Sequence, residues 1–198
     1  EGNARATWTL AALAALTIAA ALVLGVRFPS AMPAPGRPEE SAGSTMMIFS
    51  AVPWTLAGGL LGPVGAAALG LLSGLVRGVW DTHSLFTALD LGLMGGIFAV
   101  ASRQRYRTFL YRLWRQPLIS ALSLTFVHLL LFVLSALFTA AASTTVNERL
   151  DYALSNLGAA GLAFAGEMLV AGIVAQFAAA VFPNYWGGLG MLQPSPSE

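Results

Sequence analysis

Residues 56–100 read LAGGLLGPVGAAALGLLSGLVRGVWDTHSLFTALDLGLMGGIFAV. The stretch is apolar enough to lie in lipid, yet it contains ten glycines and is interrupted by Gly62-Pro63. Helices that only face lipid do not need so many glycines. Helices that pack backbone to backbone do need them, because small residues let the helix axes approach closely. The stretch therefore predicts a compact bundle of membrane helices.

The composition of the whole chain supports the same class. Of its 198 residues, 57% are hydrophobic and 10% are charged, whereas soluble domains carry about 25% charged residues. The net charge is +1 and no basic run is interleaved with aromatic residues in a soluble setting, so we expect no nucleic-acid partner. The sequence has no cysteine, which excludes disulfides and thiolate metal sites.

We predict an all-α, polytopic membrane helix bundle of about six transmembrane segments, with the lipid bilayer as its first partner. Residues 41–76 carry no charge, and as one helix they would be about 54 Å long, against a hydrocarbon core of about 30 Å. They must fold back, and Gly62-Pro63 is the natural turn of a broken helical hairpin. Whether residues 45–76 cross twice or form a re-entrant hairpin stays open. The expected helices cover residues 7–26, 45–60, 63–76, 84–101, 117–139 and 155–182.

The distribution of arginines among the loops predicts how the chain is oriented in the membrane. Residues 103–115 hold five of the ten arginines, which by the positive-inside rule makes this loop cytoplasmic. Counting spans then places both termini in the cytoplasm and the proline-rich residues 28–40 outside, in a bacterial cytoplasmic membrane. Residues 77–83 and 140–151 become outer loops. We expect one transmembrane domain over residues 1–182, followed at 183–198 by a Pro/Ser/Gly-rich cytoplasmic tail or linker.

Small residues recur every four positions on three expected helices. This spacing places them on one helix face, where they allow close packing. They pack the bundle internally or, on the first helix, contact a partner membrane subunit. The stripes are Ala11, Ala15 and Ala19; Ala66, Gly70 and Gly74; and Gly92 and Gly96.

Three ionisable residues, Asp90, His128 and Glu167, fall inside the expected spans. A carboxylate in the middle of a bilayer costs at least ~2.5–3.5 kcal/mol, so such groups face the bundle interior or water. They predict an outward-facing polar pocket for a small-molecule ligand or a proton, with Arg77 and Asp81 at its opening. His128 and Glu167 would lie at similar depth and could pair. Alternatively, the three buried groups bond serines, threonines or glutamines of neighbouring helices, and Arg77 and Asp81 form a local interfacial ion pair.

Motifs of catalysis are absent from the sequence. The two histidines are forty-five residues apart and form no zinc-binding helix motif. No Walker loop or dinucleotide fingerprint occurs, and no serine has a convincing base nearby in the sequence. We therefore expect neither an enzyme nor a catalytic residue, a bound metal or a cofactor.

The glycine-rich stretch resembles a known receptor family. Gly62-Pro63-Val64-Gly65 is followed by Gly70-Leu-Leu-Ser-Gly74-Leu-Val-Arg77 and then by Phe86-Thr87-Ala88-Leu89. This order resembles the five-transmembrane receptor domain of LytS–YhcK-type bacterial sensor proteins, over about forty residues. Asp90 in the following helix departs from that pattern. The resemblance implies a sensory module, to which cytoplasmic signalling domains are normally attached downstream.

The length and predicted topology are also similar to the substrate-binding S subunits of energy-coupling-factor vitamin transporters. In that family an alanine stripe on the first helix docks the coupling subunit, and Ala11, Ala15 and Ala19 are the matching positions. We expect a membrane-embedded sensory or receptor module that binds a ligand or senses the state of the envelope. The alternatives are a vitamin-binding transporter subunit and a structural accessory subunit of a membrane complex.

Overall fold

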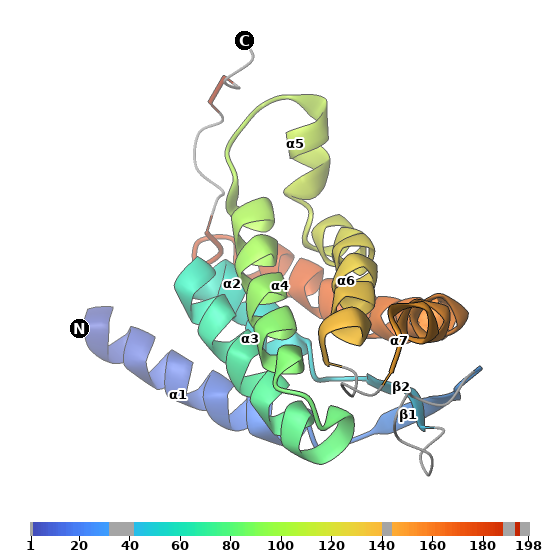
Figure 1. The fold of residues 1–198 in the computed structure, drawn as a ribbon. Helices are drawn as coiled ribbons and strands as arrows, with labels where there is room; N and C mark the ends of the chain where they lie inside the picture. The colour runs from blue at the N-terminus through green and yellow to red at the C-terminus, as the bar shows by residue number, and fades with distance from the viewer. Residues whose placement is uncertain (1, 32–41, 140–143, 188–192, 195–198) are drawn as a thin grey trace.

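The computed structural model describes residues 2–31, 42–139, 144–187 and 193–194, and it forms an all-α helical bundle with one two-stranded hairpin (Figure 1). In this part of the chain the elements follow one another in the order α1 (Gly2–Ala20), β1 (Gly25–Pro29), β2 (Ala42–Met47), α2 (Val52–Leu60), α3 (Pro63–Arg77), η1 (Gly78–Thr82), α4 (Phe86–Arg103), α5 (Phe109–Trp114), α6 (Pro117–Thr139) and α7 (Val146–Val181).

Four of these helical segments are long and apolar enough to cross a membrane. They are Pro63–Thr82, Phe86–Arg103, Pro117–Thr139 and Val146–Val181, and a shorter apolar helix covers Ala6–Ala20. Much of the apolar surface faces outward: of the 23 residues of α6, only Pro117, Ser120, Ala121 and Leu124 are buried. A helix with an apolar face on nearly every side belongs in lipid. The chain is a membrane protein.

Prolines mark the helix starts correctly. The expected helix at 117–139 has the observed bounds, and α3 begins at Pro63 as predicted. Proline suits the first helical turn because its missing N–H would have no partner there. Gly62 precedes Pro63 with φ of 95°, a conformation that glycine adopts at little cost. The Gly-Pro turn therefore separates α2 from α3, as the sequence indicated.

The predicted helix at 45–60 is wrong in its first half. Residues up to Met47 belong to β2, and α2 begins only at Val52. Pro53 lies in the first turn of α2. Likewise, the expected first span ends early, because Val26 lies in β1. Hydropathy alone does not distinguish an uncharged strand from an uncharged helix.

Three expected loops contain helix. The predicted outer loop at 77–83 contains the last residue of α3 and all of η1. The predicted outer loop at 140–151 is helical from Val146, because Thr145 and Glu148 form a capping box. The arginine-rich loop at 103–115 contains α5. The expected outer loop at 28–40 lies largely outside the described residues.

Helices α3 and α4 pack backbone against backbone. A Cβ atom on Gly70 would collide with the carbonyl of Leu91, and one on Gly74 with the backbone of Ala88. Ala66 is fully buried in the same interface. The stripe at Ala66, Gly70 and Gly74 therefore packs the bundle internally.

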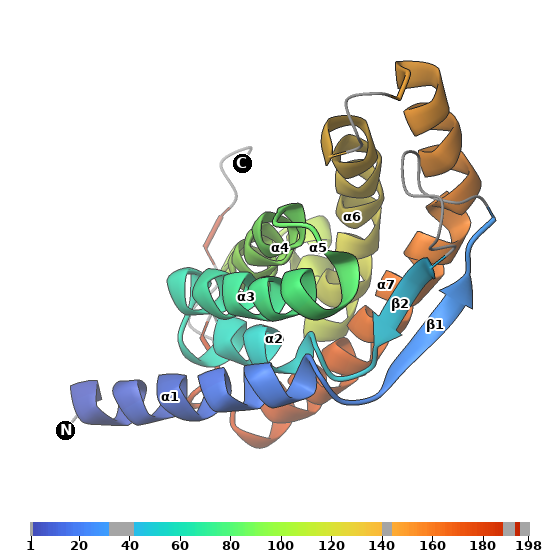
Figure 2. The same ribbon diagram turned by 60° about the horizontal axis from the view of Figure 1, so that its bottom comes forward.

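The strands β1 and β2 form an antiparallel hairpin with Gly25 opposite Met47 and Arg27 opposite Thr45. Figure 2 shows the hairpin running beside α7, and residues of β2 contact α7 directly. Figure 1 shows α5 at the opposite end of the bundle from the hairpin. The hairpin and α5 thus define two ends, which we call the hairpin end and the α5 end.

The described start of the expected tail packs against the bundle. Trp186 is only 4% exposed, and a Cβ atom on Gly59 of α2 would collide with its indole ring. The amide of Gly187 donates to the carbonyl of Gly59 at 2.8 Å. Trp186 and Gly187 therefore belong to the packed structure.

Candidate functional site

The end of α3 changes helical form next to a charged pair. After Arg77 the chain continues as the π-helical turn η1, which ends at His83 with φ of 51°. π-Helical turns are rare and are frequent at functional sites. This turn carries Asp81, whose carboxylate lies 3.8 Å from the guanidinium of Arg77. Both side chains are less than a tenth exposed.

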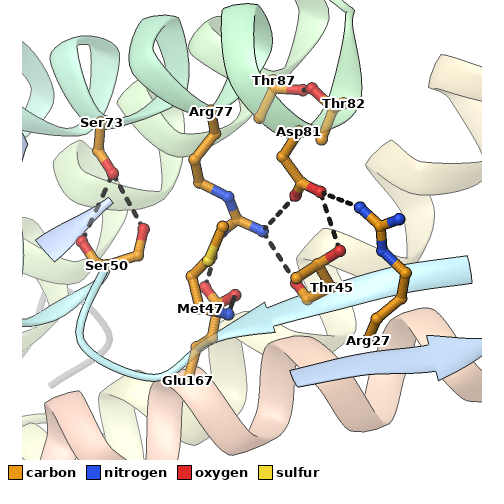
Figure 3. Close-up of polar contacts among 10 residues, drawn as sticks. All are labelled: Arg27, Thr45, Met47, Ser50, Ser73, Arg77, Asp81, Thr82, Thr87 and Glu167. Carbon is orange, nitrogen blue, oxygen red and sulfur yellow. Dashed lines mark hydrogen bonds and ion pairs between the residues drawn. The ribbon is translucent and has the colours of Figure 1, made fainter. Parts of the chain in front are cut away.

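Glu167 lies on α7 and faces the same place from the other side of the hairpin (Figure 3). Its Oε2 atom accepts from Nη1 of Arg77 at 2.9 Å, and its Oε1 atom accepts from the backbone amide of Met47 at 2.6 Å. The residue is 1% exposed. One buried carboxylate therefore joins α7 to α3 and to β2.

The hairpin lies between α3 and α7 in Figure 3 and completes the network. Nη2 of Arg77 donates to the carbonyl of Thr45 at 3.0 Å, and the hydroxyl of Thr45 donates to Asp81 at 2.9 Å. Arg27 on β1 approaches the same carboxylate at 3.5 Å, with its own side chain 59% exposed (Figure 3). We call Arg27, Thr45, Arg77, Asp81 and Glu167 the hairpin cluster. It contains two formal positive and two formal negative charges, of which only the positive charge of Arg27 is largely exposed.

Two further contacts fix the hairpin on the helices. Ser50, just after β2, shares a hydrogen bond of 3.0 Å with Ser73 of α3. The Oδ1 atom of Asn156 on α7 accepts from the hydroxyl of Ser30 and from the amide of Ala31, both at 2.9 Å. The hairpin is thus held to α3 and to α7 along its length.

A second polar contact lies between α4 and α6. Nδ1 of His128 is 2.8 Å from Oδ2 of Asp90, and the imidazole stacks on Phe164 of α7 at a centroid distance of 4.0 Å. The predicted pairing of His128 with Glu167 is wrong, because Glu167 is used by Arg77 and Met47. The alternative in which buried groups bond neighbouring serines and threonines is wrong for these residues as well.

The five predicted ligand residues therefore lie in two separate groups in the structure. Arg77, Asp81 and Glu167 belong to the hairpin cluster, while Asp90 and His128 form a separate pair. Two buried polar atoms among them, Nε of Arg77 and Oδ1 of Asp90, have no hydrogen-bond partner in the described part of the chain. Buried polar groups are nearly always paired. The Nε–H of Arg77 can therefore donate one further hydrogen bond, and Oδ1 of Asp90 can accept one.

Sequence reasoning missed the contribution of the hairpin. Arg27, Thr45 and the amide of Met47 were not predicted, because residues 45–47 were assigned to a helix. Thr45 and the preceding Gly43 are residues that suit a strand or a turn better than a helix interior. That composition is the signal that could have located the hairpin.

The alanine stripe of α1 faces away from the bundle. Ala11, Ala15 and Ala19 are all exposed, while Leu13 and Thr17 are buried. The stripe is a smooth surface without a partner in the described structure. Its role in contacting another subunit remains a prediction.

Comparison with known proteins adds no family assignment. The chain matches no family model, no curated protein and no solved structure. Its function must be argued from its own residues.

Proposed function

We propose that the chain is a membrane-embedded sensory or receptor module, in which the hairpin and the charges beneath it form the input and α7 carries the response. One observation supports this most: the buried carboxylate of Glu167 bonds both β2 and α3 from the middle of a 36-residue helix. A change in the position of the hairpin would act directly on α7.

Energetics favour a functional role for this network. Removing two charges from water costs several kcal/mol per ion, and packed hydrophobic residues in the same place are often as stable or more stable. Membrane bundles therefore keep buried charges mainly where a site or a pathway uses them. The unpartnered Nε–H of Arg77 would donate to one more acceptor, such as an oxygen of a ligand.

Signalling requires two states with different affinity for the stimulus. In the proposed resting state, Glu167 holds the hairpin through Met47. A ligand that engages Arg77 would weaken or strengthen that contact and shift α7. By the positive-inside rule, the arginine-rich α5 end is cytoplasmic, so the hairpin end would face outward in a bacterial cytoplasmic membrane.

The test combines ligand screening with distance measurement. The purified chain in nanodiscs would be screened by thermal unfolding with amino acids, short carboxylic acids and water-soluble vitamins. A true ligand at a hundredfold excess over its Kd stabilises by about 2.7 kcal/mol. Because the sequence has no cysteine, spin labels at Val26 and Leu162, both exposed, report the distance between hairpin and α7.

A receptor shows stabilisation by at least one class of compound and a changed distance distribution when that compound is present. Both effects should disappear in Arg77→Met and persist in the matched control Arg105→Gln at the other end. Absence of stabilisation by every class, together with one unchanged distance distribution, would contradict the proposal.

The exposed alanine stripe supports a second candidate, a substrate-binding subunit of a vitamin transporter. In that case α1 would dock a membrane partner through Ala11, Ala15 and Ala19. Ala15→Leu would then abolish co-purification with an ATPase-containing complex, while ligand binding persists. A sensor would show no such complex.

A further inference from the structure

An open cavity of about 420 Å³ lies at the α5 end, far from the hairpin cluster. It is bounded by the last turn of α4, by α5 and the start of α6, and by the last turns of α7. Ligand pockets usually occupy about 300–1,000 Å³, so the cavity is large enough for a small polar group. The polar side chains that line it are those of Ser102, Arg112, Arg115, Gln116 and Gln176.

These polar groups are mostly hydrogen-bond donors. Arg112 and Arg115 carry two positive charges, and they have no ion pair or hydrogen bond from their side chains among the described residues. Among the described residues that line the cavity, none carries a carboxylate. The described acidic residues lie elsewhere: Asp81, Asp90, Glu148, Asp151 and Glu167 are on η1, α4 and α7, away from the α5 loop. The cavity is therefore cationic and suited to an anion.

A second observation points to a ligand. Ser102 lines the cavity, is 1% exposed, and its hydroxyl has no hydrogen-bond partner in the described part of the chain. A buried hydroxyl without a partner costs free energy, and an anionic oxygen in the cavity would supply the acceptor. Trp186 and Pro117, both buried, form the apolar part of the wall.

The residues around the cavity indicate which kind of anion it binds. Phe109, Leu110 and Trp114 of α5 are all exposed, as expected for a short helix at the membrane interface, where aromatic residues concentrate. Ala179 and Ala180 extend the lining of the cavity along the apolar surface of α7. An ammonium headgroup would be repelled, whereas a phosphate would be held by two arginines, with acyl chains along α7.

We infer that this cavity binds the phosphate of an anionic phospholipid headgroup. Basic pockets between membrane helices on the cytoplasmic side are suited to such headgroups, and each arginine near the surface contributes about 1 kcal/mol, or roughly fivefold in affinity. Arg112 and Arg115 bind the phosphate, and Ser102 with the two glutamines completes its hydrogen bonds.

The test is native mass spectrometry of the whole chain in detergent, titrated with phosphatidylglycerol or phosphatidylcholine of the same acyl chains. We expect one phosphatidylglycerol to be retained in preference to phosphatidylcholine. Arg112→Gln and Arg115→Gln should each lower the affinity for phosphatidylglycerol about fivefold, and the double variant should lower it about 25-fold. Arg115→Lys keeps the positive charge, so it should lower the affinity for phosphatidylglycerol less than Arg115→Gln does.

Arg105→Gln is the matched control, because it removes an exposed charge from the same loop without touching the cavity. Retention of phosphatidylglycerol in Arg105→Gln, with its loss in the double variant, supports the site. Equal losses in all arginine variants, or equal retention of both lipids, would overturn it. Displacement of the lipid by glycerol 3-phosphate at equal concentration would show a site for soluble phosphates and overturn the lipid assignment.

Discussion

The two ends of the bundle use arginine in opposite ways. At the hairpin end, Arg77 is buried and bonded to a carboxylate, to a second carboxylate and to a backbone carbonyl. At the α5 end, Arg105, Arg112 and Arg115 have no ion pair or side-chain hydrogen bond among the described residues. The net charge of +1 does not reveal that paired and unpaired arginines lie at different ends of the bundle.

The difference has a physical reason. An arginine inside the bundle cannot reach water, so it must be neutralised by a partner of opposite charge. An arginine at the interface is solvated, and it can attract anionic lipids and fix the orientation of the chain. The hairpin end therefore specifies one internal arrangement, while Arg112 and Arg115 at the α5 end are available for the proposed lipid phosphate.

The largest effect should come from breaking the buried pair. Arg77→Met leaves the Glu167 carboxylate buried with only the Met47 amide as partner, and we expect the free energy of unfolding to fall by about 3–5 kcal/mol. Reversible unfolding in mixed micelles measures this loss. The double variant Arg77→Met/Glu167→Leu should recover most of it, because no unpaired charge then remains.

The matched control for that experiment is Arg105→Met at the α5 end, which removes the same charge from an exposed position outside the cavity. We expect its unfolding free energy to stay within about 0.5 kcal/mol of the unaltered protein. Equal losses of unfolding free energy in Arg77→Met and Arg105→Met would contradict the difference between the two ends.

An intermediate effect is expected at the pair between α4 and α6. His128→Ala removes the only hydrogen-bond partner that the described residues provide for Asp90, and it also removes the stacking on Phe164. The expected loss is about 1–3 kcal/mol in unfolding free energy. Thr125→Val, on the same helix, is the control: its hydroxyl is already without a partner, so its removal should cost nothing. A loss in Thr125→Val as large as in His128→Ala would refute this interpretation.

The smallest change in unfolding free energy is expected at the surface, where an exposed paired arginine can be compared with an exposed unpaired one. Arg27 is more than half exposed although it approaches Asp81, and exposed ion pairs contribute about 0–1 kcal/mol. Arg27→Gln should therefore lower the unfolding free energy slightly in low salt and not in high salt. Arg105→Gln should change it in neither condition. Salt-independent destabilisation by Arg27→Gln would mean that its packing matters more than its charge.

The sequence predicted the fold best where proline and glycine mark a boundary. The helix at 117–139 and the start of α3 at Pro63 were predicted correctly, since proline favours the first turn and Gly62 supplies the positive φ before it. The close packing of α3 on α4 followed from the spacing of Ala66, Gly70 and Gly74. These are local rules that need no knowledge of distant residues.

The site could be predicted only in part. Glu167 was singled out because ionisable residues are rare in membrane spans, and Arg77 and Asp81 because they were expected at the opening of the same pocket. The local ion pair of Arg77 with Asp81 was one of the stated alternatives, and the structure contains it at 3.8 Å. The pairing of Arg77 with Glu167 could not be predicted, because it joins positions ninety residues apart beside a hairpin that hydropathy assigned to a helix. The wrong pairing of His128 with Glu167 came from depth alone, which says nothing about which helices are neighbours.

Hydrogen exchange at the amide of Met47 tests the central claim most directly, that Glu167 holds the hairpin to α7. In nanodiscs, this amide should exchange slowly in the unaltered protein and on the order of tenfold faster in Glu167→Leu, the effect of losing one charge-assisted hydrogen bond. Amides of α3 serve as the reference for global unfolding, and Leu169→Ala, an exposed position on the same helix, serves as the control. Equal exchange of the Met47 amide in the unaltered protein and in Glu167→Leu would contradict the account.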